Sequence, residues 1–204
     1  MKLKEIVNHE KHCPERTITC PHRKCREEFQ LKKFNEHSMQ TGCAKNRINR
    51  RNGQIIGYCS DAPSGFPLAD TYWSFTQFEA HQLSFYLAMS YLVSKQSFIL
   101  RVFLPEGVES ASKYTTRITV SPSTTRKLFY EGPVLFIEDL PDENSSQVYD
   151  KYWIVSFDVM RSFIKFSTNG GRKEAKFDVG VEVLKSDDNY GTSKSSFYIS
   201  RLQC

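Results

Sequence analysis

The sequence predicts a mostly β protein, in which a small metal-binding finger precedes a larger body of short strands. Two observations carry this prediction. Residues 54–204 alternate apolar and polar side chains in about eight or nine short runs, spaced roughly ten residues apart, as in a β-sandwich or a β-barrel. Residues 20–43 carry cysteines and a histidine at spacings typical of a zinc site.

The clearest strands of the body are two long runs of alternating residues. Residues 83–91 place Leu, Phe, Leu, Met and Tyr on one face and smaller or polar residues on the other, which predicts one buried face. Residues 98–104 form a second run, which ends at Pro105. Asp158 is the predicted N-cap of one short helix that continues to Ile164. Shorter strands are predicted at 54–58, 118–120, 128–130, 134–136, 152–157, 177–183 and 197–199.

The finger follows the pattern Cys-x4-Cys-x11-His-x5-Cys. A strand is predicted at 17–19, and a helix at 31–40 turns its histidine inward. A unit of roughly two dozen residues buries too little apolar surface to fold unaided, so a structural metal is expected to organise it. The sequence therefore predicts one zinc ion, with its tetrahedral preference for sulfur and nitrogen ligands. The predicted ligands are Cys20, Cys25, His37 and Cys43.

A second pair, His9-x3-Cys13, resembles the back half of another finger. No cysteine pair precedes it in this sequence, so we expect it to hold no metal here. The favoured interpretation is that the chain begins inside a finger of a longer protein. The alternative is a pair that has lost its metal and remains as packing.

Composition narrows the class of protein and its compartment. The chain has 204 residues, of which 39% are hydrophobic, enough for one core plus a small appendage. It contains no run of 18 apolar residues and no apolar signal-peptide segment, so a membrane span and secretion are not expected. Four of its six cysteines fit the finger, which favours metal ligation in the reducing cytoplasm or nucleus.

Positive charge is concentrated in the N-terminal quarter of the chain, which makes nucleic acid an alternative partner. Residues 1–52 hold 13 Lys and Arg against 6 Asp and Glu, whereas residues 53–204 hold 15 against 17. A basic cluster stands at Lys45, Arg47, Arg50 and Arg51, where either nucleic acid or solvent is the expected neighbour. The predicted helix 31–40 offers little for reading base edges apart from Asn35, so nucleic acid is the less favoured partner.

No pattern in the sequence predicts catalysis. It contains no glycine-rich phosphate loop, no G-x-S-x-G elbow and no H-E-x-x-H helix. Cys59 and His81 could be imagined as nucleophile and base, but no orienting partner is visible in the sequence. We therefore expect a binding protein with no catalytic site in this chain.

The finger NHEKHCPERTITCPHRKCREEF, completed by His37 and Cys43, resembles the tandem TRAF-type fingers of the seven-in-absentia (Siah) family of ubiquitin ligases. There, His-x3-Cys ends one finger and Cys-Pro-x3-Cys opens the next. The resemblance implies that the body is an eight-stranded antiparallel sandwich, and that the chain forms a homodimer. It also implies the substrate-recognition part of a ligase, or a scaffold derived from one. The chain lacks the zinc ligands of the RING domain that recruits ubiquitin-conjugating enzymes.

The resemblance also implies a place for partner proteins. In that family an extended peptide adds as a strand beside the first strands of the sandwich. Trp73 stands where the family has a groove tryptophan, and Phe75 stands where it has a methionine. Ile56 and Tyr58 are the expected neighbours of the peptide. The alternative is that Trp73 and Phe75 are plain core residues, as apolar residues at period two usually are.

These expectations divide the chain into four parts. Residues 1–13 are the back half of a truncated finger and residues 14–43 a TRAF-type zinc finger. A basic linker, 44–53, leads to the Siah/TRAF-like sandwich at 54–204.

Overall fold

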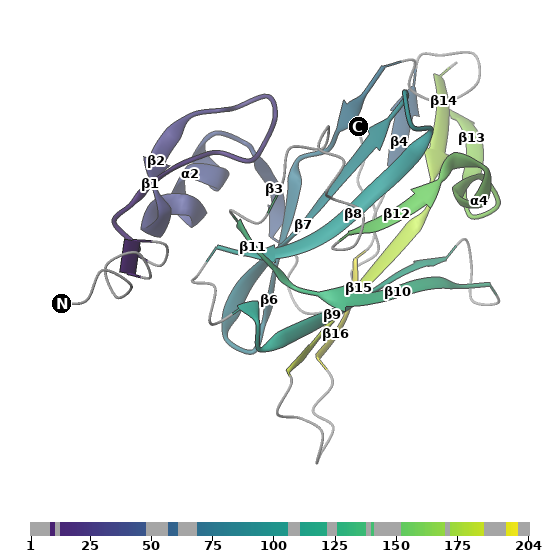
Figure 1. The fold of residues 1–204 in the computed structure, drawn as a ribbon. Helices are drawn as coiled ribbons and strands as arrows, with labels where there is room; N and C mark the ends of the chain where they lie inside the picture. The colour runs from purple at the N-terminus through teal and green to yellow at the C-terminus, as the bar shows by residue number, and fades with distance from the viewer. Residues whose placement is uncertain are drawn as a thin grey trace.

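The computed structural model describes residues 9–10, 13–47, 57–60, 69–105, 111–121, 126–137, 140, 152–169, 172–185 and 195–199. Within these ranges the chain is mostly β, with strands in several sheets and only short helices (Figure 1). The predicted class is therefore confirmed at this level. None of the described sheets closes on itself, and neither described α-helix is long and apolar enough to cross a membrane.

The N-terminal unit is a hairpin followed by a helix. Strand β1 (Thr17–Thr19) pairs antiparallel with β2 (Glu28–Gln30). One turn of 3-10 helix, η1 (Leu31–Lys33), then leads directly into α2 (Phe34–Gln40). The predicted strand at 17–19 and the predicted helical segment at 31–40 are both confirmed, and the helix differs only in its tighter first turn.

The largest sheet has seven strands in the order β11-β8-β7-β6-β3, with β12 also paired to β8 and β5 to β7. Its strand pairs are antiparallel except for β11–β8 and β3–β6, which are parallel. The strands are β3 (Ala44–Arg47), β5 (Thr71–Tyr72), β6 (Phe75–Ala80), β7 (Leu83–Leu92), β8 (Ser97–Leu104), β11 (Leu135–Phe136) and β12 (Trp153–Ser156).

Two smaller sheets and a helix complete the body. A four-stranded antiparallel sheet has the order β10-β9-β15-β16, and a three-stranded one the order β13-β14-β4. Helix α4 (Phe157–Arg161) follows β12. The strands are β4 (Gly57–Ser60), β9 (Tyr114–Ser121), β10 (Leu128–Pro133), β13 (Lys165–Asn169), β14 (Arg172–Lys176), β15 (Asp178–Lys185) and β16 (Ser195–Ile199).

The seven-stranded and four-stranded sheets pack face to face through large side chains. Phe85 of β7 meets Tyr114 of β9 edge-on, with ring centroids 5.4 Å apart. Phe98 of β8 meets Phe177, which immediately precedes β15, at 5.8 Å. Strand β9 alternates buried and more exposed residues along its length, as expected for a strand with one face in a core.

Two sequence predictions differ from the structure in the body. Helix α4 starts at Phe157, so Ser156 and not Asp158 occupies the N-cap position. The Phe157 N–H donates to the Gln96 carbonyl at 2.7 Å, which holds Phe157 at the start of the helix, and no side chain caps it. Phe163 and Ile164 follow the helix and are buried. Part of the strand predicted at 54–58 lies outside the described residues.

Candidate metal centre

The four predicted ligands lie together in the structure. One ligand atom from each of Cys20, Cys25, His37 and Cys43 can be chosen so that all four lie within 4.8 Å of one another. The Cys20 and Cys43 Sγ atoms are 3.9 Å apart, and Cys25 Sγ lies 3.5 Å from His37 Nε2. Cys20, His37 and Cys43 are buried, and Cys25 is half-buried. This group can hold a metal ion.

The first two ligands are positioned by the β1–β2 hairpin. The Cys20 N–H donates to the Glu27 carbonyl at 2.8 Å, which continues the pairing beyond the two strands. The Cys25 N–H donates to the His22 carbonyl at 2.9 Å and closes a turn between the two cysteines. Arg26 follows with φ +58°, an uncommon conformation for a residue with a side chain. These constraints bring both thiols to the same end of the hairpin.

The other two ligands are positioned by the end of α2. Thr41 donates to the His37 carbonyl from both its N–H (3.0 Å) and its Oγ1 (2.7 Å), which closes the last turn. Gly42 then adopts φ +71°, the left-handed conformation that commonly ends a helix. The chain reverses there and places Cys43 beside the helix, with Thr41 Oγ1 3.2 Å from Cys43 Sγ.

The His37 ring is held on two sides. Its Nε2 faces the cysteines, while Nδ1 lies 3.5 Å from a carboxylate oxygen of Glu27. Phe29 stacks on the ring, with centroids 4.0 Å apart and planes inclined by 16°. A carboxylate behind the second nitrogen of a metal-binding histidine fixes the tautomer that leaves the other nitrogen free to bind. The sequence prediction missed this role of Glu27, which no spacing rule reveals.

Burial favours the uncharged forms of Cys20, Cys43 and His37 before a metal arrives. It raises the pKa of the Cys20 thiol, and it also raises the pKa of Cys43 against the opposing hydrogen bond from Thr41. The pKa of His37 is lowered by burial, partly offset by the nearby Glu27 carboxylate. A neutral imidazole is the form that binds metal, whereas each of the three cysteines must bind as a thiolate.

His9 and Cys13 stand apart from this group in the described part of the chain. His9 is exposed, and Cys13 is half-buried with its carbonyl accepting a hydrogen bond from the Arg16 N–H at 3.2 Å. Neither belongs to the metal-binding group of the described residues. That the pair forms half of another finger remains a prediction.

The N-terminal unit docks on the seven-stranded sheet through Phe34. Its ring meets Tyr86 edge-on at 4.9 Å and Phe103 at 5.8 Å. The Tyr86 hydroxyl donates to Asn35 Oδ1 at 2.7 Å, so a polar contact accompanies the aromatic one. Phe34 and Tyr86 are both fully buried. The unit and the sheet consequently share one hydrophobic core.

The backbone joins the metal centre to the sheet as well. The Phe75 N–H donates to the carbonyl of the ligand Cys43 at 2.7 Å, and β3 continues from there in parallel beside β6. Residues 44–47, at the start of the predicted linker, are therefore a strand of the sheet. Arg23, in the turn between the first two ligands, hydrogen-bonds Tyr72 Oη and lies 4.7 Å from the Tyr72 ring centroid.

The four residues predicted to contact a peptide have different surroundings. Phe75 is only 3% exposed and packs against His22, Phe34 and Phe103, as the alternative of a core residue predicts. Trp73 is half-buried, stacks on Phe98 at 6.3 Å and donates its N–H to the Met89 carbonyl at 3.1 Å. Tyr58 lies in β4, where only the backbone is described, and Ile56 lies outside the described residues.

No known protein family matches the chain, and no curated protein is significantly similar to it. Its function therefore has to be inferred from the fold and the metal centre.

Proposed function

We propose that this chain is a protein-recognition module in which a zinc finger, fixed to a β-sandwich, helps to present a binding edge for extended segments of partner proteins. The observation that carries the proposal is the shared core between the metal centre and the sheet. A finger that reads nucleic acid needs an open face on its helix, whereas α2 begins with Phe34 and Asn35, which both contact the sheet.

Zinc is the proposed metal because the donor set and spacing suit it. Three thiolates and one imidazole are a common structural zinc set. A tetrahedral ion with Zn–S of about 2.3 Å and Zn–N of about 2.0 Å separates its ligand atoms by roughly 3.5–3.8 Å. The separations of 3.9 Å between Cys20 and Cys43 and 3.5 Å between Cys25 and His37 agree with this geometry. Such an ion would hold the hairpin to α2 and take no part in catalysis.

An eight-stranded antiparallel sandwich can be traced within the larger set of strands. Strands β12, β8, β7 and β6 are consecutive antiparallel neighbours, and so are β10, β9, β15 and β16. We propose that these two groups of four are the sandwich, to which β3, β5 and β11 are short additions. This arrangement supports the resemblance to the Siah substrate-binding domain, and with it a role in ubiquitin ligation or scaffolding as a cytoplasmic or nuclear homodimer.

The peptide is proposed to add beside β4, with Trp73 as its anchor. The edge of β6 is occupied by β3, and the Phe75 N–H is committed to Cys43, so a peptide cannot pair there without displacing the chain itself. Strand β4 pairs with β14 along one edge, and no described strand pairs with the other. Edge strands offer unpaired backbone groups to extended peptides.

Panning a peptide library on the zinc-loaded chain tests the proposal. Peptides selected in this way should bind Trp73→Ala about thirtyfold more weakly, the ~2 kcal/mol of an interface hot spot, while circular dichroism stays unchanged. Trp153→Phe is the matched control, because Trp153 is buried and should not contact the peptide. Unfolding by Trp73→Ala would instead make Trp73 a core residue. Salt-sensitive RNA or DNA binding abolished by neutralising Lys45, Arg47, Arg50 and Arg51 would favour the nucleic-acid alternative.

A further inference from the structure

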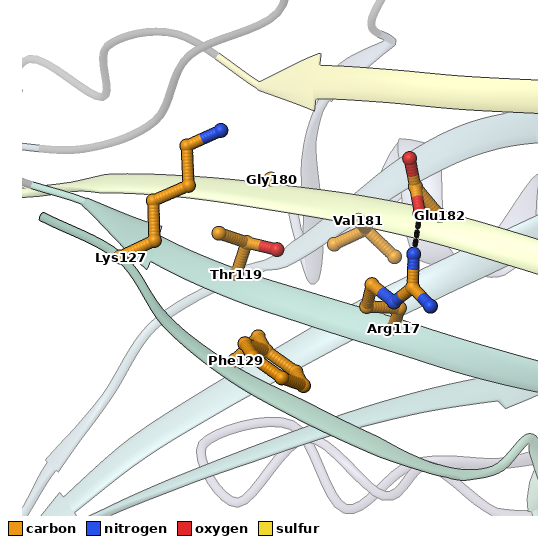
Figure 2. Close-up of a pocket in the computed structure, with 7 residues that line it drawn as sticks. All are labelled: Arg117, Thr119, Lys127, Phe129, Gly180, Val181 and Glu182. Carbon is orange, nitrogen blue, oxygen red and sulfur yellow. Dashed lines mark hydrogen bonds and ion pairs between the residues drawn. The ribbon is translucent and has the colours of Figure 1, made fainter. Parts of the chain in front are cut away.

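The outer face of the four-stranded sheet carries a hollow of about 300 Å³ that the proposed function does not use. Its floor is one cross-strand row, in which Phe129 of β10 pairs with Thr119 of β9 and Thr119 pairs with Gly180 of β15. Across these three strands the side chains shrink from a benzyl group to a hydroxyethyl group to none, and Tyr198 of β16 is the next residue of the row. The hollow is therefore built into the sheet by residue size, with Phe129 as its wall (Figure 2).

Phe129 is the most exposed large apolar residue in the described part of the chain, at 65%. Single exposed apolar residues are common and carry no information by themselves. This one borders a hollow with small residues on its other side, so a side chain entering the hollow would bury both its own surface and that of Phe129. An apolar, preferably aromatic, group is the expected occupant.

The two ends of the hollow differ in charge. At one end Arg117 is bonded to Glu131 on β10 and to Glu182 on β15, so that one cation is balanced by two carboxylates. At the other end lies Lys127, exposed and without a hydrogen bond or ion pair among the described residues. Figure 2 shows the Lys127 ammonium and the Arg117–Glu182 pair on opposite sides of Thr119. Among the described residues that line the hollow, Arg117 is paired with carboxylates and Lys127 is the cation without one.

The spacing of Lys127 and Phe129 gives the ligand's pattern. Lys127 immediately precedes β10, and Phe129 is the second residue of that strand, so the two are two positions apart and both line the hollow. Residues two apart on an extended chain lie about 6.6–6.8 Å from each other. An extended ligand segment has the same repeat, so its residues two apart can meet Lys127 and Phe129 together. We propose that this hollow binds a protein segment carrying an acidic residue two positions from an aromatic residue. The site is independent of Trp73.

Nuclear magnetic resonance titration of the zinc-loaded full chain tests this proposal. The probe is a nine-residue capped peptide of Gly and Ser with Asp and Phe two positions apart at its centre, and its matched control replaces Asp by Asn. The Asp peptide should shift the amide signals of Thr119, Phe129 and Gly180, and bind at least about fivefold more tightly than the Asn peptide. Shifts confined to the region of Trp73, or scattered over the chain, would overturn the proposal.

Matched variants locate the contact on the chain itself. Thr119→Tyr fills the hollow with a side chain that suits a strand and should weaken the Asp peptide at least about tenfold. Thr115→Tyr makes the same change two rows along the same face, opposite Pro133 and Leu184, and should have no effect. Equal binding by both variants would overturn the proposal, because occupancy of the hollow would then be irrelevant.

The charge contact is tested by Lys127→Ala, with Lys165→Ala in β13 as the control. Lys127→Ala should erase the preference for Asp over Asn, and Lys165→Ala should keep it. Trp73→Ala should leave binding of this probe unchanged, which separates failure here from failure of the proposed function.

Sedimentation tests whether a second copy of the chain occupies the hollow. If the wild type is a dimer and Thr119→Tyr converts it to a monomer, the hollow is a self-association surface and the proposal is wrong.

Discussion

The two large sheets of this protein differ in how many of their faces are covered. Strand β7 is buried on both faces over most of its length, and every residue of β8 is buried. Strand β9 of the four-stranded sheet buries alternate residues and leaves the others partly open. Both sheets share the interface between them, so the difference lies in their outer faces.

The N-terminal unit accounts for much of this difference. It covers the outer face of the seven-stranded sheet around Tyr86 and Phe103 through Phe34, whereas Phe129 on the outer face of the other sheet stays exposed. A finger that supplies a third layer is part of the hydrophobic core of the body. Metal binding should therefore stabilise the sheet as well as the finger.

The strongest test of this coupling is loss of the metal. Cys25→Ala removes one ligand, and the finger should lose folding free energy on the order of 10 kcal/mol. Because the finger covers Tyr86, the melting temperature of the β body should fall too. Calorimetry with elemental analysis measures both effects, and Cys13→Ala should keep one zinc per chain. A body that melts at the same temperature with and without metal would show that the two parts are independent.

Truncating Phe34 and Phe129 in turn compares the stability that each outer face contributes. Phe34→Ala deletes a fully buried ring in contact with Tyr86 and Phe103, at an expected cost of about 3–5 kcal/mol. Phe129→Ala removes the same group from the exposed face and should change stability by less than about 0.5 kcal/mol. Urea unfolding measures both. Similar losses of stability for the two variants would mean that the contact between Phe34 and the sheet stabilises the protein no more than the solvent-exposed Phe129 does.

The same contrast shows what the sequence could predict. The ligand group was predictable because four ligands at fixed spacing in a short segment have few ways to meet. The strands with one covered face were predictable too, since β9 and β15 repeat apolar residues at period two. The alternation in β7 predicted one buried face, but Tyr86 on the other face is buried as well.

What the sequence could not predict depends on docking. Phe29 and Phe34 suit a small core inside the finger, and their rings are 6.0 Å apart, but nothing in the sequence pairs Phe34 with Tyr86. Strands β13 and β14 are rich in polar residues, so they lack the apolar alternation on which a prediction rests. Residues 44–47 form strand β3 because they pair with β6, and their basic, polar sequence carries no strand pattern that would predict this.

The pH dependence of stability should change sign with metal. Without metal, the raised pKa values of Cys20 and Cys43 mean that the fold favours protonated thiols, so stability should decline as pH rises above about 9, their ordinary value. The lowered pKa of His37 adds a loss of stability as pH falls below its ordinary 6.5. With metal, each cysteine ligand releases a thiol proton, so raising the pH towards 9 should strengthen binding by about 1.4 kcal/mol per pH unit for each proton released.

Thermal melts of the loaded and metal-free chain from pH 5.5 to 10 measure both trends. Cys13→Ala serves as the control, because Cys13 lies outside the metal-binding group of the described residues. Parallel curves for the two forms would contradict the assignment of Cys20 and Cys43 as ligands.

A smaller effect than that of Phe34→Ala is expected for the hydrogen bond between Tyr86 of β7 and Asn35 of α2. Tyr86→Phe deletes the hydroxyl that donates to Asn35 Oδ1 at 2.7 Å and leaves the ring packing against Phe34 in place. Its cost should be about 0.5–1.5 kcal/mol, the net contribution of one hydrogen bond. Asn35→Ala and the double variant complete a cycle that isolates the bond from the packing, and the coupling should vanish in metal-free protein if the finger then leaves the sheet. Coupling that persists without metal would show that Phe34 and Asn35 hold the finger in place by themselves, so that packing and not the metal would fix this third layer.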